Sequence, residues 1–132
     1  MSLFESGENY LETILVLTQR NGWVRSIDIA AEMNFSKPSV SRAMSILKQD
    51  GYITINGDGH ILLTDAGLKK ASSVWDRHVT LTRYINEILG VDKAIAEKDA
   101  CRIEHIISPE TFAGLKAQLL DWESKHPQST RS

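Results

Sequence analysis

Cys101, Glu104 and His105 bring three metal-binding side-chain types together in one short stretch of the sequence. The stretch from Lys98 to Ile107 is predicted to be helical, which would place the three side chains on one face, about one turn apart. A thiolate, a carboxylate and an imidazole held that close could bind a single divalent cation. Each residue also has an ordinary structural role open to it, such as a small buried hydrophobe for the cysteine. The cluster therefore suggests a metal site but does not decide it alone.

Four further residues from other predicted helices could complete such a site: Asn9, Glu12, His78 and Glu97. Asn9 and Glu12 are spaced i, i+3 and would share one face of the first predicted helix. Ligands drawn from both the start and the later part of the chain would let a cation favour one relative orientation of the two parts. That property is what a metal sensor needs. A capping role for Asn9 and a simple hydrogen-bonded role for His78 remain the alternatives.

The elements that must position these residues are mostly helical. Apolar residues at i, i+4 and i+7 predict a first amphipathic helix, which Asn21-Gly22 ends. Ser26 is predicted to cap a second helix and Ser36 a third, in which Pro38 suits the first turn. Two β-rich stretches around a Gly-rich turn predict a hairpin. The predicted helices span 6–20, 27–33, 37–49, 65–89, 92–96 and 99–107, with a last one starting at 108–110, and the predicted strands span 52–55 and 60–63.

The order helix, short helix, tight turn, helix and hairpin is that of a winged helix-turn-helix. In this module the second helix of the pair presents its N-terminal residues to base edges in the DNA major groove. Arg42 is the best candidate for a bidentate contact with guanine, worth about 1–3 kcal/mol of discrimination. Pro38 could pack on a thymine methyl group, and Arg25 suits a phosphate contact.

Capping and solvation alone would explain Ser36. They would not explain an early helix face that is rich in hydroxyls and carries only basic charges. The residues predicted to bind DNA are Arg25, Ser36, Lys37, Pro38, Ser39, Ser41, Arg42 and Lys48.

Composition is compatible with this reading. The chain of 132 residues has a formal net charge of −2 and 42% hydrophobic residues, as in ordinary soluble proteins. From Arg20 to Lys48 there are five basic and two acidic residues, a local charge of +3 that suits one DNA-facing surface. No apolar run reaches the length of a membrane span and the start lacks a secretory signal, so we expect a cytoplasmic protein without a membrane partner. The single cysteine excludes an internal disulfide.

Six segments carry a resemblance to a known family: Glu8 to Ile14, Ser36 to Ser41, Asp50 to Tyr52, Leu63 to Gly67, Arg77-His78, and Asp99 to His105. Together they make the stretch from Gly7 to about Leu120 similar to the diphtheria-toxin-repressor family of metal-dependent regulators. The chain ends before the SH3-like domain of the iron-type members, which resembles the short manganese-transport-regulator branch. The resemblance implies a homodimer that binds a palindromic operator when loaded with Fe²⁺ or Mn²⁺ and represses metal-uptake genes.

The fold class implied is mainly α with a small β-hairpin. A winged helix-turn-helix DNA-binding domain over 1–71 would precede an all-helical metal-binding and dimerisation domain over 72–126 and a polar tail over 127–132. The dimer contact is expected in the last half of the chain, at Trp75, Tyr84, Ile88 and Leu89 together with the late helices.

The resemblance also assigns metal ligands. His78, Glu104 and His105 match the ligand positions of the family, and Glu12 matches a ligand of the manganese branch. Cys101 stands where iron-type members have cysteine. Asn9 stands where Asp or Met is usual, Thr82 stands where iron-type members have a second-site Glu, and Glu97 could partly replace that carboxylate. The expected metal is Mn²⁺ or Fe²⁺, with Zn²⁺ or Co²⁺ as alternatives because a thiolate favours them.

The function predicted is a metal-dependent repressor of metal-ion homeostasis genes. Metal binding would restrain the N-terminal helix and set two recognition helices about 34–36 Å apart on the DNA. One alternative is a winged-helix regulator of an organic ligand or an oxidant, with Cys101 as a redox thiol. Another is constitutive DNA binding with a metal site eroded at Asn9 and Thr82. An enzyme is not expected, because the cluster has no general base outside the ligand set and no substrate-pocket signature accompanies it.

Overall fold

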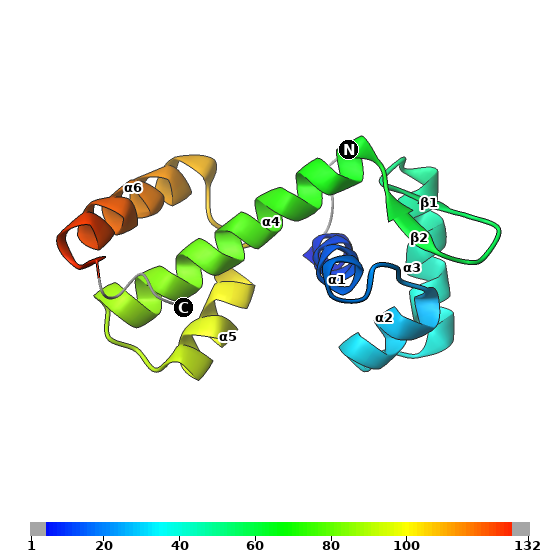
Figure 1. The fold of residues 1–132 in the computed structure, drawn as a ribbon, viewed down its shortest axis with the longest axis horizontal. Coiled ribbons are helices and arrows are strands. Elements are labelled where there is room, and N and C mark those ends of the chain that lie inside the picture. Colours follow the sequence, from blue (N-terminus) through cyan, green and yellow to red (C-terminus); the bar gives the residue numbers. More distant parts are fainter. Residues whose placement is uncertain (1–4, 128–132) are drawn as a thin grey trace. The chain divides into compact units, whose positions relative to one another are not determined.

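A computed structural model describes residues 5–127 of the chain. The start, 1–4, and all of the expected polar tail except Pro127 lie outside the described residues. The chain divides into two compact units, Met1–Ser73 and Val74–Ser132. Figure 1 shows helices throughout and one two-stranded hairpin, the mainly α class expected from the sequence. No helix among the described residues is long and apolar enough to cross a membrane.

The first unit is a winged helix. Its elements are α1 (Glu5–Asn21), α2 (Ser26–Met33), α3 (Lys37–Gln49), β1 (Ile53–Ile55), β2 (Ile61–Leu63) and the beginning of α4 (Asp65–Arg83). The core is formed by apolar side chains of all these elements, among them Leu11, Ile14 and Ile29, which are fully buried. Tyr10 packs edge-on against Phe35 at the edge of this core, and burial raises its pKa above the ordinary value. The predicted order of elements is confirmed.

Local side-chain contacts fix the ends of the helices in this unit. The Ser36 hydroxyl accepts from the backbone N–H of Ser39 at 3.3 Å, so the predicted cap of α3 is confirmed. The cap predicted for α2 is wrong by one residue. Arg25 is the cap, and its backbone N–H donates to the Asp28 carboxylate at 2.8 Å. The Asp28 carboxylate in the first turn of α2 thus provides a hydrogen-bond acceptor for the backbone N–H that precedes the helix. Ser26 already belongs to the helix.

The hairpin is antiparallel, with Ile53 opposite Leu63 and Ile55 opposite Ile61. A close junction joins it to the first turn of α4. The Thr64 hydroxyl donates to the carbonyl of Gly51 at 2.7 Å and accepts from the N–H of Gly67 at 3.1 Å. A Cβ at Gly67 would lie 2.0 Å from the carbonyl oxygen of Tyr52, so only glycine fits at that position.

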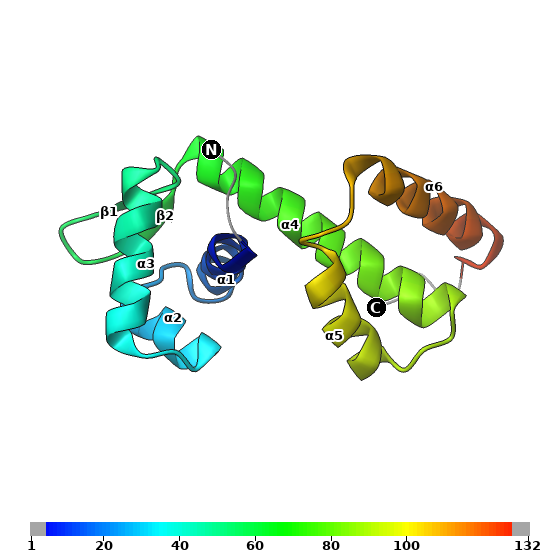
Figure 2. The same ribbon diagram turned by 180° about the vertical axis from the view of Figure 1, so that it is seen from behind.

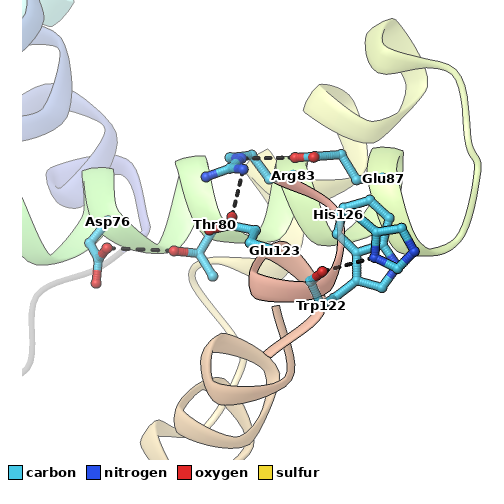
Figure 3. A network of polar contacts seen from close by, with 7 residues as sticks. All are labelled: Asp76, Thr80, Arg83, Glu87, Trp122, Glu123 and His126. Carbon is cyan, nitrogen blue, oxygen red and sulfur yellow. Dashed lines mark hydrogen bonds and ion pairs between the residues drawn. The ribbon is translucent and has the colours of Figure 1, made fainter. Parts of the chain in front are cut away.

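The second unit contains the rest of α4, a π-helical turn η1 (Tyr84–Ile88), α5 (Lys93–Ile103) and α6 (Pro109–Lys125). Figures 1 and 2 both show α5 and α6 beside the later part of α4. A single helix over 65–89 was expected; instead it widens at η1, where the N–H of Leu89 donates to the carbonyl of Tyr84. Arg83 pairs with Glu87 in this turn and with Glu123 of α6, which ties η1 to α6 (Figure 3).

The two short helices predicted over 92–96 and 99–107 are a single helix, α5. Asp92 caps it by accepting from the N–H of Ala94 at 3.2 Å, and Ala96 and Ala100 bury one face. The helix has no internal glycine or proline to interrupt it, so the predicted break is wrong. It also ends earlier than predicted, at Ile103.

Candidate metal centre and nucleic-acid interface

Glu104 is the most deeply buried charged side chain among the described residues, with 1% of its surface exposed. It is the C-terminal cap of α5. One carboxylate oxygen, Oε2, lies 3.1 Å from Nδ1 of His78, which belongs to α4. The other, Oε1, lies 3.3 Å from Nε2 of His105. The structure thus brings one buried carboxylate and two imidazoles into a single cluster within the second unit.

Burial of this carboxylate demands compensation. A buried charge is costly unless it is paired or coordinates a metal. Oε1 of Glu104 makes no hydrogen bond to any described residue, although His105 lies close to it. A cation placed against this oxygen would satisfy it, and carboxylate and imidazole are both ligands of Mn²⁺, Fe²⁺ and Zn²⁺. The donor set therefore fits a divalent cation.

The end of α5 explains how the two ligands on this side of the cluster are presented. After Ile103 the chain makes tight turns, in which the N–H of Ile106 donates to the carbonyl of Ile103 at 3.0 Å. The β-branched residue Ile107 and then Ser108-Pro109 follow, and a proline disfavours helical geometry in the residue before it. Glu104 and His105 consequently stand in a turn between α5 and α6. The side chain of His105 is only 2% exposed there.

The prediction that Cys101, Glu104 and His105 share one face of a continuous helix is therefore wrong. Cys101 lies in the last turn of α5 and is exposed, whereas Glu104 is buried beyond the end of the helix. Glu97 is exposed on the same helix, two turns before Glu104. A ligand role for either residue stays a prediction.

The two candidates from the N-terminal helix belong to the first unit. Asn9 and Glu12 are partly buried on α1, one turn apart. The backbone carbonyl of Asn9 accepts from the Thr13 hydroxyl at 2.8 Å. Thr82, which the resemblance places at the position of a second-site carboxylate, is buried in the second unit.

The predicted DNA-binding residues lie on the surface of the first unit. Every one of them is exposed: Arg25, Ser36, Lys37, Pro38, Ser39, Ser41, Arg42 and Lys48. Helix α3 contains no acidic residue, and its buried face uses Val40, Met44 and Leu47. Its outer face is therefore free to meet a polyanion, in the manner of a recognition helix.

One feature of this surface was not anticipated. Trp23 stacks on His60 with ring centroids 5.1 Å apart, and the Arg25 guanidinium lies 5.2 Å from the Trp23 ring. Nε of Arg25 also donates to the carbonyl of Asp58 at the hairpin tip, at 3.1 Å. Arg25 thus connects the α1–α2 loop to the wing. Arg25 and Asp58 are 33 residues apart in the sequence, so no local sequence pattern predicts this contact.

A winged helix with exposed basic residues, together with a buried carboxylate–imidazole cluster, defines a class: DNA-binding regulators that respond to a metal. Two family models match the chain. Residues 2–61 match the N-terminal DNA-binding domain of iron-dependent repressors, and residues 64–129 match the metal-binding and dimerisation domain of the same proteins. The chain therefore belongs to the iron-dependent repressor family, and the resemblance to diphtheria-toxin-repressor proteins is confirmed.

Similar proteins agree with this assignment. An uncharacterised HTH-type transcriptional regulator of Methanocaldococcus jannaschii is 30% identical over 122 residues, which is 92% of this chain and 98% of that protein. The iron-dependent repressor IdeR of Mycobacterium bovis is 31% identical over 82% of this chain, but the match spans only 47% of IdeR. The structure of the manganese regulator SloR is 25% identical, with a TM-score of 0.77 over 90% of this chain and 54% of SloR. The chain thus spans about half the length of these two characterised relatives.

Proposed function

We propose that this protein represses metal-ion homeostasis genes by binding DNA when its second unit holds Mn²⁺ or Fe²⁺. The family is one of metal-dependent DNA-binding repressors. The observation that carries the proposal for this chain is the buried Glu104 carboxylate between His78 and His105. Such a cluster is costly unless a positive charge is bound, so it is suited to report whether a cation is present.

His78, Glu104 and His105 would hold the cation, which would supply charge compensation and fix the three side chains relative to one another. We extend the ligand set to Glu12 of α1, and then to Asn9, Cys101 and Glu97, on the strength of residue type and family resemblance. A ligand from α1 would link metal binding to the DNA-reading unit. Carboxylate donors suit Mn²⁺ and imidazole donors suit Fe²⁺, and participation of Cys101 would shift the preference toward Fe²⁺, Zn²⁺ or Co²⁺.

For DNA we propose that α3 enters the major groove, with Arg42 reading a guanine and Pro38 packing on a thymine methyl group. Lys37, Lys48 and Arg25 would contact phosphates. The exposure of these side chains supports the assignment. We propose a homodimer on a palindromic operator, because two copies related by two-fold symmetry would read two half-sites of opposite orientation.

The test is an anaerobic gel shift on DNA upstream of the protein's own gene and of nearby metal transporters. Mn²⁺, Fe²⁺, Co²⁺ and Zn²⁺ are titrated separately, with a chelator as the blank. Glu104→Ala removes the central carboxylate, and Glu110→Ala, at an exposed position of α6, is the matched control. Metal-dependent retardation that is lost in Glu104→Ala and kept in Glu110→Ala supports the proposal.

Two other outcomes would overturn it. Equal retardation with chelator and with every metal would leave a constitutive DNA-binding protein. A second candidate function rests on the exposure of Cys101, which is open to oxidants. Retardation that responds to mild oxidant, is lost in Cys101→Ser and ignores metals would establish that alternative.

A further inference from the structure

Arg77 immediately precedes His78 in α4 and contacts the turn that carries Glu104 and His105. Its Nη1 donates to the carbonyl of Glu104 at 3.2 Å and to the carbonyl of Ile107 at 2.9 Å. These two carbonyls lie at the two ends of the turn between α5 and α6. One guanidinium nitrogen therefore closes the turn across its whole length.

The physical need for this contact comes from the end of α5. The last carbonyls of a helix have no partner within the helix and carry partial negative charge, so a cationic donor is favourable there. The Arg77 guanidinium also lies 5.5 Å from the centre of the Phe112 ring of α6. This position over the ring limits the rotation of the planar group and keeps its N–H bonds directed at the turn.

Glu104 is consequently held at two points by consecutive residues of one helix. Arg77 holds its backbone carbonyl, and His78 lies 3.1 Å from its carboxylate. Because the two contacts start from neighbouring positions on α4, they determine where the carboxylate lies relative to the imidazole. His105 follows Glu104 in the same turn and is placed by the same hydrogen bonds.

We infer that Arg77 is a positioning residue of the metal centre, which fixes the separation of His78, Glu104 and His105 and thereby the affinity and coordination geometry of the bound cation. This inference rests on the proposed function of the cluster. Partners that orient metal ligands without touching the metal typically contribute a factor of about 10–100 to metal affinity. A residue that only stabilised the fold would leave the geometry of the loaded site unchanged.

The experiment compares Arg77→Met, Arg77→Lys and the control Arg83→Met in the full chain. Arg83 lies six residues further along α4 and pairs with Glu87 and Glu123 (Figure 3), so its loss removes an arginine and its ion pairs without touching the turn. Co²⁺ is the probe. Its dissociation constant is measured by competition with a chelator, its visible absorption reports coordination geometry, and circular dichroism with thermal unfolding reports the fold of the metal-free protein.

We expect Arg77→Met to weaken Co²⁺ binding about 10–100-fold and to change the absorption spectrum. Arg77→Lys keeps the charge but loses the planar donor group, so its affinity should fall between those of Arg77→Met and the unaltered protein. Arg83→Met should bind Co²⁺ with the unaltered spectrum, even if it unfolds at a lower temperature.

An unchanged affinity and spectrum in both Arg77 variants would overturn the inference, as would an equal change in Arg83→Met. If Arg77→Met does not fold, the comparison of Arg77→Lys with Arg83→Met decides in the same way. Glu104→Gln separates this inference from the proposed function. If Glu104→Gln binds Co²⁺ as tightly as the unaltered protein, the metal site itself is refuted, whereas loss of binding there with unchanged Arg77 variants refutes only the role of Arg77.

Discussion

The two units of the chain are built on different kinds of interior. The first unit buries Leu, Ile, Val and Met side chains from its helices α1 to α3, the loop between α1 and α2, and both strands. Among the described residues, the buried polar or charged ones, Thr80, Thr82 and Glu104, all belong to the second unit, and two of its buried apolar residues are alanines. An apolar core contains no buried charge that a bound ion would have to compensate. A unit with a buried carboxylate gains most from a bound cation, and this difference suits one unit to reading DNA and the other to sensing.

The substitution with the largest expected effect on the first unit is Gly67→Ala. The added Cβ would meet the carbonyl oxygen of Tyr52 at 2.0 Å, so α4 and the hairpin would have to separate. We expect a loss of about 3 kcal/mol in the free energy of unfolding, the upper end for overpacking. Gly114→Ala is the matched control, since a Cβ there meets nothing within 4 Å in the middle of α6. It should stabilise by about 0.5–1 kcal/mol. Urea unfolding measures both, and similar effects at the two positions would contradict the close junction.

The corresponding test of the second unit, which contains the buried carboxylate, is Glu104→Gln. With metal at about a hundred times its dissociation constant, the unaltered protein should gain about 2.7 kcal/mol over the chelated form. The variant should lose that gain, and its chelated form should be no less stable than the unaltered protein because a buried charge has been removed. Thermal unfolding with and without Mn²⁺ measures this. Destabilisation of the chelated form alone would mean that Glu104 serves the fold and not a cation.

Arg42→Ala tests whether DNA recognition by the first unit is separate from metal binding by the second. Loss of a bidentate guanine contact should cost about 1–3 kcal/mol of operator binding and relax specificity at one base pair. The Mn²⁺ dissociation constant should stay the same. Fluorescence anisotropy on operator variants and metal competition provide the two readouts. A uniform loss on all DNA sequences would reassign Arg42 to phosphate contact.

The smallest effects come from a motif that the two units share. Ser36 and Ser108 each cap a helix that begins with a proline in its first turn, and each hydroxyl accepts a backbone N–H from three residues later. Ser36→Ala and Ser108→Ala should therefore destabilise by a similar amount, about 1 kcal/mol. Only Ser36→Ala should also weaken DNA binding, as measured by gel shift. Equal effects on DNA would remove Ser36 from the interface.

What the sequence predicted well is what depends on neighbouring residues. The cap at Ser36, the start of the last helix at Ser108-Pro109 and the hairpin follow from turn chemistry and apolar spacing, and the structure confirms them. Two errors, the cap of α2 and the break within α5, were local, whereas the π-helical turn involves a distant residue. Arg83, at the start of the π-helical turn, pairs with Glu123, which lies forty positions later in the sequence. No local sequence pattern predicts this contact.

For the candidate metal site as well, the sequence predicted the residues but not their arrangement. The residue types were evident from the sequence, and the resemblance named His78, Glu104 and His105. Their separation depends on a turn whose geometry is set by a proline and by Arg77. Helical periodicity therefore grouped Cys101 with Glu104, although one is exposed and the other buried.

The exposure of Cys101 gives the protein a built-in chemical handle. It is the only thiol in the chain, so a maleimide dye attaches at one defined position without any engineering. The rate of that reaction then reports how accessible and reactive the sulfur is. Slower labelling with Mn²⁺, Fe²⁺ or Zn²⁺ would identify the ions that recruit the thiolate, and an unchanged rate would assign those ions to oxygen and nitrogen donors alone.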